Sequence, residues 1–200
     1  YDADPLLDEY FFSIAHSEMR LYDGNDTFHY TARFGGIRYQ SYILALTYFM
    51  SIYIRHERFA EALVSKEPSV KLENVLTISS DTEGFVESIR DAINSFGSIF
   101  EDFEEVTLDN AKSIFEVLSC SRKNTALLSR PASPLPLIIQ CSDQGFIRCL
   151  TAARIDPMQF LLDSLRHHFP GDYDKHQQSR EKSMQMAIKR VLNECFPRLK

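Results

Sequence analysis

The chain has 200 residues, of which 44% are hydrophobic and 25% are charged, a composition typical of globular proteins. This composition excludes extensive disorder, because enough apolar side chains are present to form a core. The length suits one domain, and we expect residues 1–200 to form a single helical domain. The alternative is a subdivision into an acidic helical part, residues 1–120, and a part with a hairpin and basic helices, residues 137–200.

The formal net charge of −6 is unevenly distributed along the chain. Residues 1–110 hold 20 acidic and eight basic side chains, whereas residues 111–200 hold eight acidic and 14 basic ones. This asymmetry indicates a basic binding surface in the C-terminal half, two halves that attract each other in the fold, or a helix face that is simply solvated.

The chain begins with Tyr1 instead of Met, so we expect a processed chain or a piece of a larger protein. No signal-peptide pattern is visible at the start of the sequence. The four cysteines form no C-x-x-C pair, which argues against a disulfide scaffold or a zinc site. We therefore expect free, buried thiols and a cytoplasmic location. The four are Cys120, Cys141, Cys149 and Cys195.

The first predicted helix begins at Asp4-Pro5, because Asp caps free backbone N–H groups and Pro is tolerated in a first helical turn. It ends near Leu21, before a turn-forming cluster. A short strand or extended segment is predicted over residues 27–34. Gly35-Gly36 then gives the backbone the freedom to turn.

Residues 39–54 contain no charged residue, no glycine and no proline, and their apolar side chains cover most of a helical wheel. A helix that is apolar nearly all round must be surrounded. Sixteen residues are short for a membrane span, which needs about 20 apolar residues. The pattern therefore predicts a central buried helix of a helical protein, from about residue 37 to 65. Its second half, from Arg55, is amphipathic and should leave the core.

The middle of the chain contains further helices. Residues 70–78 fit neither the helical nor the strand period. A capping-box pattern, Ser80 with Glu83, predicts a helix that ends at Gly97. A short acidic helix is expected over residues 98–105, with Phe100 and Phe103 on its buried side. Thr107 can cap the next helix, which should run to about Cys120.

The C-terminal third contains four predicted elements. They are a proline-rich linker over residues 119–136, a β-hairpin over residues 137–150, a helix that begins at Asp156-Pro157, and a last helix over residues 172–195. The predicted fold class is therefore mainly α, a bundle of about six or seven helices around the buried central helix, with one small β-hairpin.

Motifs for catalysis are missing from the sequence. It contains no G-x-S-x-G elbow, no P-loop and no G-x-G-x-x-G, so we predict no catalytic residue, cofactor or metal, and an enzyme is not the favoured interpretation. One group of acids and histidines suggests a divalent cation site, but its spacing matches no zinc pattern. We interpret this group as a solvated helix end. Its members are Asp163, His167, Asp172, Asp174 and His176.

Two hypotheses of function follow. The first is a non-catalytic helical module, without a membrane span, that binds a protein partner or self-associates. The last helix bears Met184 and Met186 and an apolar face with Ile188, Val191 and Leu192, and it can bury that face against a partner.

The alternative is a nucleic-acid-associated domain that uses the basic C-terminal half. Phosphate neutralisation would supply the affinity. Glu181 and Glu194 interrupt the basic face, which argues against this hypothesis. The predicted contact residues are Arg122, Lys123, Arg166, Lys182, Lys189 and Arg190.

Overall fold

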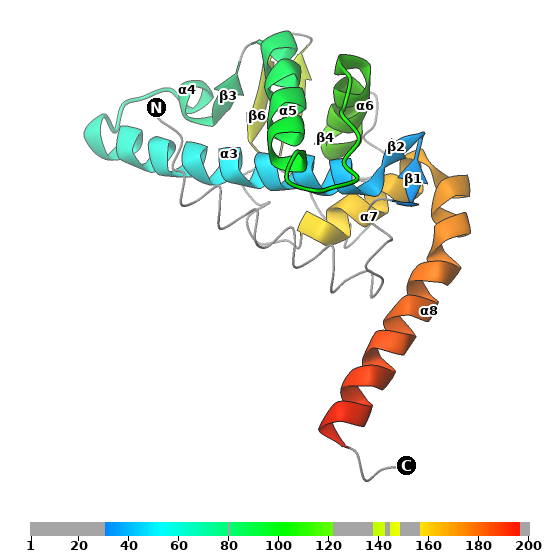
Figure 1. The fold of residues 1–200 in the computed structure, drawn as a ribbon. Helices are drawn as coiled ribbons and strands as arrows, with labels where there is room; N and C mark the ends of the chain where they lie inside the picture. Colours follow the sequence, from blue (N-terminus) through cyan, green and yellow to red (C-terminus); the bar gives the residue numbers. More distant parts are fainter. Residues whose placement is uncertain (1–30, 80, 122–137, 143–144, 149–156, 197–200) are drawn as a thin grey trace.

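The computed structural model describes residues 31–79, 81–121, 138–142, 145–148 and 157–196 (Figure 1). In this part of the chain the fold is mainly α, as predicted, and the predicted first helix at residues 4–21 lies outside it. The helices are α3 (Tyr39–Lys66), α4 (Leu72–Leu76), α5 (Thr82–Gly97), α6 (Leu108–Leu118), α7 (Pro157–His168) and α8 (Pro170–Cys195).

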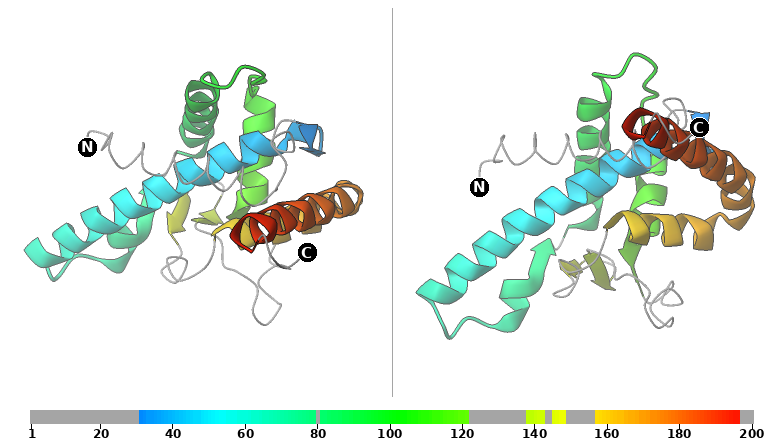
Figure 2. Two further views of the ribbon diagram at one scale, coloured as in Figure 1. Left: turned by 60° about the horizontal axis from the view of Figure 1, so that its bottom comes forward. Right: turned by 90° about the horizontal axis from the view of Figure 1, so that it is seen from below.

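Helix α3 is the central element, as the uncharged stretch predicted. Its first 15 residues are almost all buried, and Tyr42, Leu44 and Phe49 have no exposed surface. The second half leaves the core, and the side chain of Phe59 is 48% exposed. Helices α5 and α6 lie on one side of α3, and α7 lies on another (Figures 1 and 2).

Three phenylalanine rings join α3 to the helices that cover it. The ring centroid of Phe49 on α3 lies 5.8 Å from that of Phe85 on α5 and 6.3 Å from that of Phe115 on α6. Phe85 and Phe115 close the triangle at 5.9 Å, in an edge-to-face arrangement. Such ring pairs add roughly 0.5–1.5 kcal/mol each to the stabilisation that burial provides.

A short hairpin precedes α3. Strand β1 (Arg33–Phe34) pairs in antiparallel fashion with β2 (Ile37–Arg38). Its turn consists of Gly35 and Gly36, whose φ angles of 59° and 81° lie in the left-handed region that favours glycine. The predicted start of the central helix at residue 37 is therefore two residues too early, because Ile37 and Arg38 pair with β1.

The predicted hairpin at residues 137–150 is confirmed as β5 (Ile138–Ser142) and β6 (Gly145–Arg148). The structure adds one strand on each side, which gives the order β3-β6-β5-β4. Strand β3 (Thr77–Ser79) overlaps residues 70–78, whose apolar pattern fits neither a helix nor a strand. Strand β4 (Ser119–Cys120) lies where a linker was predicted, and it runs parallel to β5.

Helix termini agree with the capping predictions in part. Thr107 caps α6, and its hydroxyl oxygen accepts the backbone N–H of Asn110 at 3.2 Å. The N-cap of α5 is Asp81, whose carboxylate accepts the N–H of Gly84 at 3.0 Å, and Ser80 lies outside the described residues.

The predicted acidic helix at residues 98–105 is wrong, because this segment forms turns and extended chain between α5 and α6. Side chains from elsewhere hold it. The side-chain amide of Asn94 accepts the backbone N–H of Val106 at 2.8 Å and donates to the carbonyl of Val106 at 3.1 Å. The guanidinium groups of Arg33 and Arg38 contact the Glu104 carboxylate at 2.5 and 2.8 Å and lower its pKa.

We expect Phe49→Ala to lower the free energy of unfolding by about 3–5 kcal/mol, because it leaves a cavity between three helices. Phe59→Ala on the same helix is the matched control and should cost less than about 1 kcal/mol, since Phe59 is 48% exposed. Urea unfolding followed by circular dichroism measures both. Equal effects of the two substitutions would contradict the central position of α3.

Candidate interaction surface

Helix α8 is continuous over 26 residues, and its second half extends away from the rest of the molecule (Figure 1). At 1.5 Å per residue the helix is about 39 Å long. Proline is tolerated at a first helical position, so Pro170 begins α8 after the chain turns at Phe169. In the turned views of Figure 2, α8 lies in front of the body, by which we mean the described residues that precede it.

The first two turns of α8 are attached to the body. The Asp172 carboxylate accepts the backbone N–H of Gly35 at 2.8 Å, which ties α8 to the turn between β1 and β2. The ring of His176 lies 5.4 Å from that of Phe34, and the guanidinium of Arg166 on α7 lies 5.8 Å from the Tyr173 ring. These contacts hold the start of α8 in one orientation.

The turn between α7 and α8 is close-packed. A Cβ atom at Gly35 would lie 2.4 Å from the ring of Phe169, so only glycine fits against this ring. In the preceding turn, burial lowers the pKa of His168, and the neighbouring His167 lowers it further against the opposing effect of Glu116. His168 is therefore kept neutral more readily than an exposed histidine.

Beyond Ser183, which is buried, α8 presents apolar side chains to solvent. We call residues 184–196 the outer half of α8. Five of its large apolar side chains recur at helical spacing on one face, and Met186 (56% exposed) lies on the opposite side of the helix. The five are Met184 (46% exposed), Ile188 (53%), Val191 (52%), Leu192 (51%) and the C-cap residue Phe196 (55%).

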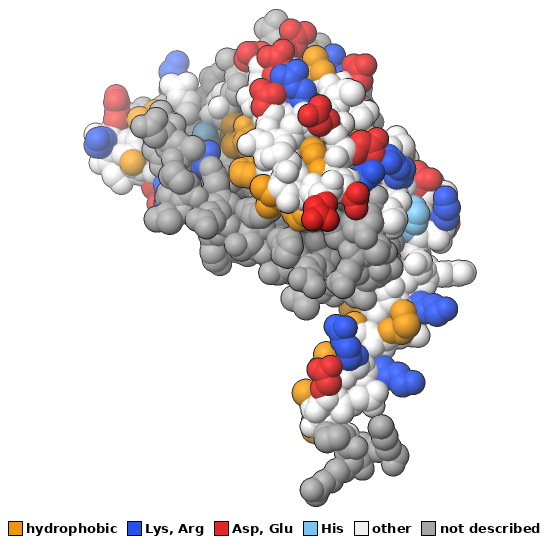
Figure 3. Space-filling view, in the orientation of Figure 1, with side chains coloured by type: hydrophobic (Ala, Val, Ile, Leu, Met, Phe, Trp, Pro, Cys, Tyr) orange, Lys and Arg blue, Asp and Glu red, His pale blue; other side chains and the backbone are white. Residues whose placement is uncertain are grey.

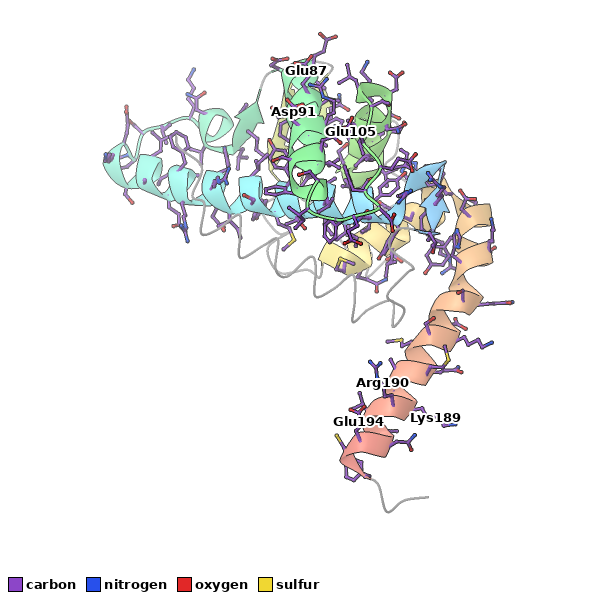
Figure 4. The ribbon with its side chains drawn as sticks, in the orientation of Figure 1. Glu87, Asp91, Glu105, Lys189, Arg190 and Glu194 are labelled. Carbon is purple, nitrogen blue, oxygen red and sulfur yellow. The ribbon has the colours of Figure 1, made fainter. Side chains whose placement is uncertain are left out.

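An open groove runs along this face, lined by Gln185, Ile188, Lys189, Leu192, Asn193 and Phe196. Lys182 and Lys189 are seven residues apart and follow one border of the apolar face. Figure 4 shows Lys189 on one side of the helix and Arg190 with Glu194 on the other. The apolar face of the outer half therefore has a basic border on one side, with Lys182 and Lys189, while Arg190 and Glu194 lie on the other side.

The opposite end of the molecule is acidic. Residues 81–109, which cover α5 and its connection to α6, contain nine acidic side chains and one basic side chain. Figure 3 shows acidic side chains gathered over this region. We call the exposed members that do not pair with Arg33 or Arg38 the acidic face. They are Asp81, Glu83, Glu87, Asp91, Glu101, Asp102, Glu105 and Asp109.

The structure describes four of the six predicted nucleic-acid contacts, and it does not bring these four into one patch. Arg166 lies in the last turn of α7, beside Tyr173 at the start of α8. Lys182, Lys189 and Arg190 are exposed further along the helix, and Lys189 and Arg190 lie on different sides of it (Figure 4). Arg122 and Lys123 lie outside the described residues.

The acid and histidine group near α8 has other roles. Asp172 binds the Gly35 N–H, the Gln159 amide donates to Asp163 at 3.2 Å, and His176 contacts Phe34. In the described part of the chain, no three such side chains are placed to hold a metal ion.

The cysteine prediction is confirmed in part. Cys120 is buried and forms no disulfide. Cys195 forms no disulfide either but is exposed, because it lies on the projecting part of α8. The side chain of Cys141, and all of Cys149, lie outside what the structure describes.

Comparison of the chain with known protein families, with curated proteins and with solved structures finds no match. Among the helices in the described ranges, none combines the length and the apolar character needed to cross a membrane. The surface of α8 therefore has to be interpreted from its own geometry and charge.

Two glycine substitutions test the attachment of α8. Gly36→Ala should cost about 1–2 kcal/mol, because its φ of 81° is unfavourable for alanine, although a Cβ there meets no other atom. Gly35→Ala should cost more, since its Cβ also displaces Phe169. Hydrogen exchange at residues 169–176 should become faster in Gly35→Ala alone, and equal exchange in both variants would contradict the described packing.

Proposed function

We propose that this protein is a non-catalytic helical module that binds a protein surface through the outer half of α8. The observation that carries the proposal is the projection of this half-helix from the body with its apolar face exposed. Large contiguous apolar patches on a protein surface typically mark interaction sites. An amphipathic helix that presents such a face commonly docks into a groove or against other helices.

Stability supports the same conclusion. Isolated helices shorter than about 12–15 residues are marginal in water, and most helical stability comes from packing of the apolar face. Among the described residues, the outer half of α8 is supported mainly by its connection to the inner half of the helix. Covering the half-exposed Ile188, Val191 and Leu192 would contribute roughly 1 kcal/mol for each side chain before the cost of association.

The anchor positions are defined by this geometry. Met184, Ile188 and Val191 follow the spacing that a docking helix uses to insert side chains into a partner. Lys182 and Lys189 lie beside them, so a complementary surface is apolar in its centre and acidic at its border.

Photo-crosslinking tests this proposal. We expect benzoylphenylalanine at position 188 to capture a protein, either a second copy or another chain, in cells that produce the protein. The same residue at position 59 is the matched control, because Phe59 is exposed to a similar extent, 48% against 53% for Ile188. A capture at position 188 that is no stronger than at position 59 would contradict the proposal.

A second candidate is nucleic-acid binding, favoured by the exposure of Lys182, Lys189 and Arg190 on one projecting helix. Two glutamates on the same helix, Glu181 and Glu194, reduce its charge. Double-stranded nucleic acid prefers continuous positive surfaces, so this candidate ranks below protein binding.

Electrophoretic mobility shift at two salt concentrations tests the second candidate. If it is correct, labelled DNA or RNA should bind at about 50 mM salt and dissociate at about 200 mM, because phosphate contacts release counterions. Binding should be lost in Lys189→Glu/Arg190→Glu and kept in Ile188→Gln, which changes the apolar face alone. No binding of the unaltered protein at low salt would remove this candidate.

A further inference from the structure

We infer that the occupant of the outer half of α8 is the acidic face of a second copy of this chain. This inference rests on the proposed function, since it names the partner for the same apolar face. It starts from charge. Residues 180–196 hold four basic and two acidic side chains, whereas residues 81–109 hold nine acidic and one basic. The two segments thus carry net charges of +2 and −8 within one molecule.

The two charged surfaces do not meet within one copy. Helix α8 runs away from α5 and α6, which carry the acidic face (Figures 1 and 2). The helix contains no glycine or proline after Gly171, and contacts with Gly35 and Phe34 hold its first turns. A helix of this kind does not fold back onto α5 and α6 of its own molecule, because sharp kinks need glycine, proline or an insertion. The acidic face can therefore meet this helix only when the two belong to different molecules.

The acidic face also offers apolar surface. Ile99, in the connection between α5 and α6, is 64% exposed, the largest exposed fraction among the large apolar side chains of the described residues. Glu101 and Asp102 follow it in the chain, and Phe100 and Phe103 are half-buried beside it. An apolar centre with an acidic border complements the apolar face and basic border of α8.

Not all acids of this region are available. The Glu104 carboxylate is bound by Arg33 and Arg38, and Asp91 pairs with Arg90 at 2.7 Å. Glu87 and Glu105 are exposed, and Figure 4 labels Glu87 on α5 and Glu105 in the connection between α5 and α6. We choose these two carboxylates for substitution.

The resulting contact is heterologous, because the donor and acceptor surfaces are different and lie at opposite ends of the molecule. Such contacts generate closed rings or open chains of subunits. The apolar face is about 20 Å long, which places the interface at the small end of protein interfaces and implies reversible, concentration-dependent assembly. Charges at its border make assembly weaker at high salt.

Charge reversal in two complementary variants tests the inference by analytical ultracentrifugation. The unaltered protein should form species heavier than a monomer, and Lys182→Glu/Lys189→Glu should sediment as a monomer. Glu87→Lys/Glu105→Lys should also be monomeric. An equimolar mixture of the two variants should associate again, because each reversed helix then meets a reversed face. Lys66→Glu, an exposed site at the end of α3, is the control and should associate normally.

Each other outcome has a defined meaning. A monomeric unaltered protein, or a mixture that stays monomeric, overturns the inference, while capture of a different protein at position 188 leaves the proposed function intact. Ile188→Gln/Leu192→Gln removes the apolar face without altering charge and should abolish association. Association that persists in this variant would overturn both the inference and the role of α8. Circular dichroism of each variant confirms that it is folded.

Discussion

Burial of the uncharged first half of α3 is the constraint on which the rest of the structure depends. A helix with apolar side chains on all sides has to be covered on all sides, and α5, α6 and α7 provide this cover in the described part of the chain. The phenol of Tyr42 donates to the Phe34 carbonyl at 3.0 Å, so the hairpin before α3 is fixed to the same core. Burial raises the pKa of this phenol, with a smaller contribution from Asp172, and keeps it protonated as a donor.

The position of α8 follows from that core. Phe34 and Gly35 are held by the hairpin, and they in turn hold His176 and Asp172 in the first turns of α8. Phe169 packs on Gly35, where no larger residue fits. The direction in which α8 projects is thus set by contacts near its start. Its outer half needs no contact with the body to keep this direction, because a continuous helix is stiff over this length.

Charge is separated along the same axis. The ion pairs of Arg33 and Arg38 with Glu104 lie within the N-terminal half of the chain, and they attach the acidic connection to the hairpin. Lys189 and Arg190 in the outer half of α8 lie far from this connection (Figure 4). One interpretation of the charge asymmetry is attraction between the two halves of the chain inside one molecule. The outer half of α8 does not provide this attraction. Opposite charges at opposite ends favour contacts between molecules instead.

The sequence by itself determined the features that depend on local chemistry. The absence of charged residues over positions 39–54 predicted the buried helix, and Thr107 predicted the start of α6. Gly145 indicated the loop of the β5–β6 hairpin. Strands β3 and β4 are too short to show a period, and they exist because β6 and β5 offer backbone partners from distant parts of the chain.

Two other features also required the tertiary structure. The acidic segment at residues 98–105 has helical composition but is held in an irregular path by Asn94, Arg33 and Arg38, which no local pattern reveals. The apolar face of α8 was visible in the sequence as an amphipathic pattern. Amphipathicity is the same whether a helix packs on its own protein or on another, so only the tertiary structure decided that this face is exposed.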